Sequence, residues 1–299
     1  MYLATDQYFP PLASRPSRRP QVSTLRERGS GRINEDVVLA DDNLFGVFDG
    51  ATSLDGETFA GGTTSGGLLA ADIAAQTFAE NDASLARLAA RANRRIATAQ
   101  QAYGIDVRQR HRLWSTSMAV LRLEGDSFAY CQIGDAAILL LHEDGSHRLL
   151  TAEVDIDGET LAQWQEAASA GASDIYETLG EQIRRVRLEM NHTYGVLNGE
   201  ERALGFLSHG RHSLNGVSAL LLFTDGLHLP RRSPRLPGSW EEFAAIYRRS
   251  GLHGLHDEVR HRQRQDPRCH AYPRFKCHDD IAAVAIDLHP TTHPATALA

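Results

Sequence analysis

Short runs of apolar residues separated by polar turns recur along the chain and predict β-strands. The runs lie at residues 37–39, 44–48, 117–123, 128–133, 137–141, 147–150, 217–223 and 281–287, and residues 203–207 form another short run. Two pairs of consecutive runs, one beginning at Ser117 and one at Ala137, flank glycine-containing turns of the kind that close β-hairpins. Because a hairpin pairs neighbouring strands in opposite directions, the sheets are expected to be largely antiparallel.

A second pattern, with apolar positions three or four residues apart, predicts helices with one buried face. It covers residues 67–79, 84–103, 239–249 and 255–265, and residues 156–190 are predicted to be mostly helical. Antiparallel strands with helices inserted in pairs are typical of sheets covered by helices. The pattern therefore predicts an α+β layered fold.

The composition of the two ends differs from that of the middle. Residues 1–20 contain four prolines and scattered arginines, which predicts a flexible lead-in. Residues 290–299 are expected to form a flexible tail. Between them, no stretch is rich enough in glycine, serine or proline to separate two domains, so residues 21–289 are expected to form one domain.

Charge and cysteine content narrow the class of protein. The net charge of −7 argues against binding to nucleic acid or to an anionic membrane. No run approaches the roughly 18 apolar residues that indicate a membrane span. Three cysteines are too few for a disulfide framework, so a reducing, cytoplasmic location is expected. The sequence does not define the oligomeric state, and a monomer is the expectation.

Four acidic motifs stand at the ends of strand-like runs. They are Asn34-Glu35-Asp36, Phe48-Asp49-Gly50, Phe223-Thr224-Asp225-Gly226 and Asp279-Asp280-Ile281. An aspartate before glycine is a common turn signal, and each motif taken alone has that simpler interpretation. Carboxylates at the ends of buried strands are costly unless they are paired or bind a metal ion. Because Mg²⁺ and Mn²⁺ prefer oxygen ligands, the motifs together indicate a metal-dependent hydrolase.

The order of these motifs resembles that of the metal-dependent protein serine/threonine phosphatases, the type 2C or PPM family, in a divergent bacterial-like form. The resemblance spans residues 28–287, and two further segments carry it: Ser115-Thr116-Ser117-Met118-Ala119 and Gln132-Ile133-Gly134-Asp135. It implies a four-layer α-β-β-α sandwich of two mainly antiparallel sheets flanked by helices. It also implies two Mn²⁺ or Mg²⁺ ions at one edge of the sheets, with a third ion as a possible addition.

The resemblance implies a set of metal ligands. By the family pattern, Asp49 would bridge both ions and Gly50 would offer its backbone carbonyl to one of them. Asp225 and Asp279 would hold the other ion, and Asp135 would help to bind a third. The implied substrate is a phosphorylated protein.

The resemblance also implies catalytic roles beside the metal ions. Glu35 and Asp36 would orient metal-bound waters. The family's phosphate-binding arginine lies four residues before this glutamate, where this chain has Gly31. Arg32 is one place nearer and is the favoured replacement, with Arg28 as the alternative, since a guanidinium suits bidentate phosphate binding.

A further departure from the family concerns the proton donor. Family members have a histidine directly after the Asp-Gly motif, and this chain has Ala51 there. His192, His209 and His212 precede the strand that leads to Asp225 and are candidates to replace it.

The preferred interpretation is a phosphatase that hydrolyses phosphoserine or phosphothreonine through a metal-activated bridging water. Two alternatives stay open: a non-catalytic phosphatase-like protein that binds a phosphorylated partner, and a phosphatase of a small phosphorylated metabolite. The departures favour the binding protein, whereas retention of Asp49, Asp225 and Asp279 favours the enzyme. A two-metal nuclease is disfavoured by the acidic net charge.

Overall fold

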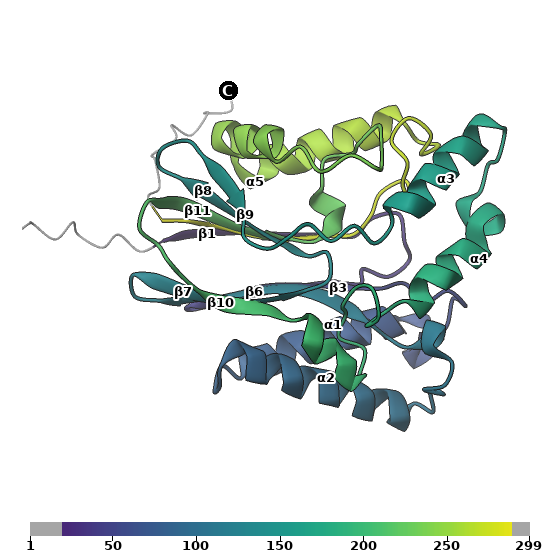
Figure 1. Ribbon diagram of the computed structural model, residues 1–299, viewed down its shortest axis with the longest axis horizontal. Coiled ribbons are helices and arrows are strands. Elements are labelled where there is room, and N and C mark those ends of the chain that lie inside the picture. The colour runs from purple at the N-terminus through teal and green to yellow at the C-terminus, as the bar shows by residue number, and fades with distance from the viewer. Residues whose placement is uncertain (1–19, 289–299) are drawn as a thin grey trace, which may run out of the picture.

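Two five-stranded β-sheets stacked face to face form the middle of the molecule (Figure 1). The structure is a computed structural model, and it describes residues 20–288. In spatial order, sheet A consists of β1 (Gln21–Glu27), β12 (Ile281–Asp287), β11 (Val217–Phe223), β8 (Ala137–His142) and β9 (His147–Leu149). Sheet B consists of β10 (Ser208–Ser213), β7 (Ser127–Ile133), β6 (Thr116–Glu124), β3 (Leu44–Gly50) and β2 (Asp36–Asp41).

Every strand pairing in the two sheets is antiparallel, as the hairpin pattern predicts. A small separate hairpin joins β4 (Thr58–Phe59) to β5 (Thr64–Ser65) just before the first helix.

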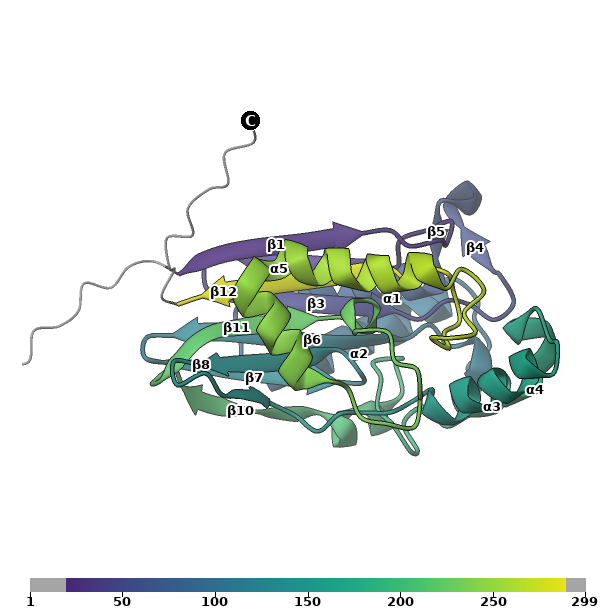
Figure 2. The same ribbon diagram turned by 90° about the horizontal axis from the view of Figure 1, so that it is seen from above.

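Helices cover the outer face of each sheet, so the fold has four layers (Figure 1). Helices α1 (Gly66–Ala79) and α2 (Leu85–Ala102) cover sheet B, and α5 (Trp240–Gln265) covers sheet A. Helices α3 (Gly158–Ser169) and α4 (Ile175–Leu188) pack against each other beyond one end of the sheets (Figure 2). The predicted four-layer α-β-β-α sandwich is confirmed.

Alternation of side chains along the central strands accounts for two separate hydrophobic layers. In β11, Leu221 and Phe223 face α5, whereas Leu220 and Leu222 face the other sheet. β12 and β8 alternate in the same way, because both are buried on two sides. A strand that is buried on both faces is a continuous apolar run in the sequence, and such a run predicts a strand.

The differences from the predicted elements have physical causes. The apolar pattern does not predict β1 or β10, because both are edge strands with largely polar sequences and half-exposed faces. The strand predicted at residues 203–207 is wrong: this segment forms the 3₁₀ turn η3 (Glu201–Phe206). Its apolar residues Ala203 and Phe206 pack into the cluster beneath α1 and α2 instead of pairing with a strand.

The two helices predicted at residues 239–249 and 255–265 belong to the single element α5, which is broken at Gly251. The φ of 66° at Gly251 lies in the left-handed region, which glycine adopts readily. The expected tail at residues 290–299 lies outside the described residues, as does the expected lead-in apart from Pro20. In residues 20–288, no helix is both long enough and apolar enough to cross a membrane.

Packing between the two sheets gives a direct test of the fold. Leu222 lies in this layer and is fully buried, so Leu222→Ala should lower the free energy of unfolding by about 2–5 kcal/mol. Leu236→Ala makes the same chemical change at a side chain that is 62% exposed, and it should change this free energy by less than about 0.5 kcal/mol. Urea denaturation followed by circular dichroism measures both. Equal losses in the two variants would contradict the inter-sheet core.

Candidate metal centre

The register of sheet B places three polar residues side by side at one end of neighbouring strands. Asp49 of β3 pairs with Asp36 at the start of β2 and with Ser117 near the start of β6. Because antiparallel strands alternate in direction, the end of β3 lies beside the starts of β2 and β6. The first two acidic motifs are therefore neighbours across the sheet.

The same edge of sheet A carries the other predicted metal ligands. The end of β11 lies beside the starts of β12 and β8, with which it pairs. Asp225 follows β11, whereas Asp279 precedes β12 and Asp135 precedes β8. Antiparallel pairing thus gathers three residues that are far apart in the chain.

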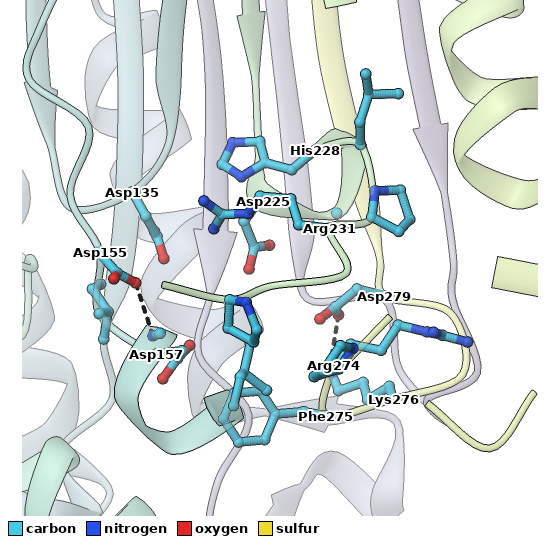
Figure 3. Close-up of a pocket in the computed structure, with 18 of the residues that line it drawn as sticks. Asp135, Asp155, Asp157, Asp225, His228, Arg231, Arg274, Phe275, Lys276 and Asp279 are labelled. Carbon is cyan, nitrogen blue, oxygen red and sulfur yellow. Dashed lines mark hydrogen bonds and ion pairs between the residues drawn. The ribbon is translucent and has the colours of Figure 1, made fainter. Parts of the chain in front are cut away.

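Carboxylates from both sheets line one cavity of about 650 Å³. Every residue predicted to bind metal lies in its wall: Asp49, Gly50, Asp135, Asp225 and Asp279. A smaller cavity of about 150 Å³ shares part of this wall. Figure 3 shows that acidic side chains from four segments point into one space: Asp135, Asp157, Asp225 and Asp279.

Burial and mutual repulsion dominate the electrostatics of this cluster. Burial raises the pKa of Asp49 well above its ordinary value, and the carboxylates of Asp36 and Asp135 raise it further. Burial also raises the pKa of Asp225, with Asp49 as the strongest neighbouring charge. Like charges confined in a poorly solvated space favour protonation or a bound cation.

The two acids of the first motif have different positions. Asp36 lines the cavity, and its Oδ2 accepts a hydrogen bond of 2.7 Å from the Thr224 hydroxyl. Glu35 lies behind the cavity wall, where its carboxylate accepts hydrogen bonds from the hydroxyls of Ser65 and Thr52. Burial raises the pKa of both carboxyl groups.

Asp280 is a structural carboxylate, in contrast to its neighbour Asp279. It is 4% exposed, and its two oxygens accept hydrogen bonds from the backbone N–H groups of Glu35 at 2.9 Å and Gly29 at 2.7 Å. These bonds hold the first motif against the start of β12. The paired aspartates of the fourth motif therefore have separate roles.

A buried arginine, Arg260, holds the backbone of Asp279 in place. Arg260 of α5 donates hydrogen bonds to the Asp279 backbone carbonyl at 2.9 Å and to Glu27 Oε1 at 2.8 Å. His256 contacts the other oxygen of Glu27 at 2.5 Å. Since Glu27 ends β1, this network fixes the Asp279 backbone between an edge strand and a helix.

Two glycines allow the backbone of the motifs to pass very close to other chain segments. A Cβ on Gly50 would lie 2.4 Å from the carbonyl oxygen of Gly67. A Cβ on Gly226 would lie 1.8 Å from the carbonyl oxygen of Asp280. Both distances are far shorter than a van der Waals contact, so the glycine of each Asp-Gly pair is required by packing.

The donor groups suit a hard divalent cation. The carboxylates and the Gly50 carbonyl supply only oxygen, which Mg²⁺ and Mn²⁺ prefer. Across residues 20–288, no three His, Cys, Asp or Glu side chains already form a group that could hold a metal ion. Mg²⁺ usually keeps several of its waters and takes one or two carboxylates. The oxygen donors of the cavity wall therefore fit Mg²⁺ or Mn²⁺.

Several predicted residues are not brought to the cavity. Arg28 and Arg32 are exposed, and neither lines it; the Arg28 guanidinium donates to the Arg32 carbonyl at 3.2 Å. The candidate proton donors His192, His209 and His212 are also absent from its wall. His209 and His212 lie on β10, the edge strand of sheet B.

Other residues that the sequence patterns do not single out also line the cavities, among them Asp157, Arg187, His228 and Lys276. Burial, followed by the nearby Asp135 carboxylate, raises the pKa of Asp157 to about 7. Burial lowers the pKa of His228 to about 4, so this imidazole is neutral near pH 7. The sequence does distinguish Lys276 in one way, because it is the only lysine in the chain.

Comparison with protein families gives a match over most of the chain. Residues 27–261 match the family model described as protein phosphatase 2C. A search of curated proteins found no match.

Solved structures with a similar fold are bacterial phosphatases. The catalytic domain of PstP, in complex with two manganese ions, is 18% identical with a TM-score of 0.54, and the match covers 90% of this chain and 97% of that one. PppA from Pseudomonas aeruginosa is 16% identical with a TM-score of 0.54, covering 91% and 98%. Stp1 from Staphylococcus aureus is 12% identical with a TM-score of 0.51, covering 94% and 100%. At these identities the similarity concerns the fold.

The raised pKa of Asp157 predicts a pH dependence of stability in the presence of a chelator. A carboxyl group whose pKa rises from 3.8 to about 7 on folding stabilises the fold fully below pH 3.8, and this contribution is lost as the pH rises through 7. Asp157→Asn should remove a slope of up to about 1.4 kcal/mol per pH unit between these values. Urea denaturation at several pH values measures it.

The matched control for this experiment is Asp126→Asn, which makes the same change at an exposed turn. It should leave the slope of the wild-type protein unchanged. An Asp157→Asn variant that keeps the wild-type slope would show that the Asp157 carboxyl is already ionised in the folded protein.

Proposed function

This chain belongs to the protein phosphatase 2C family, and from that premise we propose that its acidic cavity holds two divalent cations, Mn²⁺ or Mg²⁺. The substrate is a protein that carries phosphoserine or phosphothreonine, and the reaction is hydrolysis of the phosphate ester. One observation supports this proposal most: carboxylates from the ends of strands in both sheets converge on a single cavity. PstP, which was solved with two manganese ions, shares the fold.

The metal ligands in this proposal are residues of the cavity wall that carry carboxylate or carbonyl oxygens. Asp49, near the end of β3, would bridge both ions, with the Gly50 carbonyl beside it. Asp225 and Asp279 would hold the second ion, and Asp135 would serve a third. The bound ions would lower the pKa of a water and stabilise the attacking and leaving oxygens of an in-line displacement.

The residues around these ligands prepare the cavity for the reaction. Asp36, which is fixed by the Thr224 hydroxyl, would orient a metal-bound water. Glu35 is fixed by two hydroxyl groups and holds Thr52 at the rim of the cavity. Because neighbouring segments already fix both carboxylates, little reorganisation is needed when substrate binds.

The first test is substitution of two metal ligands by the nearly isosteric asparagine. Asp49→Asn and Asp225→Asn should each reduce Mn²⁺-dependent hydrolysis of an aryl phosphate and a phosphothreonine peptide by more than about 100-fold. Loss of a group that merely hydrogen-bonds to a ligand already costs roughly 10–100-fold, so loss of the ligand itself should cost more. Both variants should remain folded, and their melting temperatures in chelator should equal or exceed that of the wild type, because a repelling charge is removed.

Near-normal turnover in either variant would show that the assigned ligands are wrong. Absent turnover in the wild type, despite tight Mn²⁺ binding, would instead support a phosphatase-like binding protein or an enzyme that rejects generic substrates. Asp126→Asn, at an exposed turn, is the control for nonspecific effects of an asparagine substitution.

The second test concerns the proton donor. Residue 51 is alanine, and among the described residues no histidine lines the larger cavity. Since a general acid typically contributes about 10²–10⁴-fold, turnover should fall steeply as the leaving alcohol becomes more basic along a series of phosphate esters. Ala51→His should not lower turnover and should make this dependence shallower. A large loss in Ala51→His would mean that the cavity is shaped around the small side chain.

A further inference from the structure

We propose that Lys276, together with Arg187, binds the phosphate group of the substrate. This inference rests on the proposed function and assigns its phosphate site to residues outside every acidic motif. The site takes a phosphate monoester or inorganic phosphate. These residues are far in sequence from Arg32 and Arg28, neither of which lines the cavity.

The first argument is the charge distribution in the cavity wall. Among the described residues, Lys276 and Arg187 are the two basic side chains that line the larger cavity, whereas its acids are Asp36, Asp49, Asp135, Asp157, Asp225, Asp279 and Asp280. A dianionic phosphate would meet mostly carboxylates there. Cationic side chains are therefore needed beside the metal ions, and in the wall of the larger cavity these two supply them.

The second argument is the geometry of Lys276. Its Nζ lies 3.0 Å from Asp279 Oδ1 and 3.2 Å from Thr52 Oγ1, and its side chain is 21% exposed. The ammonium therefore lies between a proposed metal ligand and the segment that follows Asp49-Gly50. An ammonium has three N–H donors, so these two contacts leave one N–H for an incoming phosphate oxygen.

The third argument is that Arg187 reaches the same residue from another segment. Arg187 of α4 donates from Nη2 to the Thr52 backbone carbonyl at 3.2 Å. Lys276 contacts the hydroxyl of this same threonine, so two cations from separate segments meet at Thr52. A guanidinium with further N–H groups, together with an ammonium, suits the several oxygens of a phosphate.

The composition of the chain supports a specific role for the ammonium. Lysine and arginine together number 31, and Lys276 is the single lysine. Everywhere else the chain uses a guanidinium, including the surface ion pairs. Lysine is a compact point charge on a flexible stem, which fits a narrow position beside metal ions better than a planar guanidinium does.

Metal binding would free Lys276 for this role. The Asp279 carboxylate holds the ammonium at 3.0 Å. A divalent cation bound to Asp279 would neutralise that carboxylate and weaken its attraction for the ammonium. The contact to Thr52 would then keep Lys276 in the cavity wall, where a phosphate becomes its strongest partner.

The first experiment uses the uniqueness of the lysine. The Mn²⁺-loaded protein is treated with an amine-acetylating reagent, and acetylation of Lys276 is followed by mass spectrometry, with the terminal amine as internal control. Inorganic phosphate should slow acetylation of Lys276 by about tenfold, since an ammonium–phosphate contact is a charge-assisted hydrogen bond, and should not protect the terminal amine. Equal acetylation of Lys276 with and without phosphate would overturn the proposal.

The second experiment measures the affinity for inorganic phosphate by calorimetry and the KM for an aryl phosphate, both with Mn²⁺. Lys276→Met should weaken phosphate binding and raise KM by about tenfold or more, and Arg187→Gln by a smaller factor. Lys276→Arg, which keeps the charge, should restore a substantial part of the affinity. Arg184→Gln is the matched control, because Arg184 lies one turn earlier on α4, exposed and outside the cavity wall.

The outcomes separate this proposal from the proposed function. Loss of phosphate binding in Lys276→Met would support the phosphate site even if the wild type hydrolysed no substrate. Unchanged phosphate affinity in Lys276→Met, combined with tighter Mn²⁺ binding, would overturn the proposal and make Lys276 a counter-ion of the acidic cluster. Hydrolysis of phosphate esters by the wild type, combined with equal phosphate affinity in the wild type and all variants, would also overturn the proposal.

Discussion

Repulsion among carboxylates at one edge of two stacked sheets is the constraint on which the rest of the molecule depends. Burial and neighbouring charge raise the pKa of Asp36, Asp49 and Asp225 together, so ionisation of these carboxyl groups lowers the stability of the fold. The surrounding structure opposes this repulsion by fixing the backbone on which the acids stand. Strands buried on both faces supply that rigidity, and Asp280 and Arg260 tie the ends of the motifs together.

The acidic motifs could be predicted from the sequence because the relevant signals are local. A buried strand is a continuous apolar run, and a carboxylate at its end appears next to it in the chain. Antiparallel pairing then brings the ends of neighbouring strands to one edge without any further information. The same pattern does not predict the edge strands β1 and β10, because their exposed faces carry polar residues and leave no apolar run.

The cationic side of the cavity could not be predicted in this way. Lys276 comes from a loop and Arg187 from a helix beyond the sheets, and only the tertiary fold brings them to Thr52. The chain has Gly31 at the position of the family's phosphate-binding arginine, and the sequence favours Arg32 as its replacement, with Arg28 as the alternative. The backbone before Arg32 is fixed by Asp280 and by a hydrogen bond of 2.8 Å from the Ser30 N–H to the His278 carbonyl, which leaves Arg32 exposed to solvent.

The link from Glu27 through Arg260 to the Asp279 carbonyl connects the first strand to the acidic cavity, although β1 lies at the outer edge of its sheet. Deletions or fusions that disturb the pairing of β1 with β12 would be transmitted through one guanidinium to Asp279, a proposed metal ligand. The starting residue of an expressed fragment would therefore affect the acidic cavity. A fragment that begins at the first acidic motif would lack β1 and lose this support, although it would keep every proposed ligand.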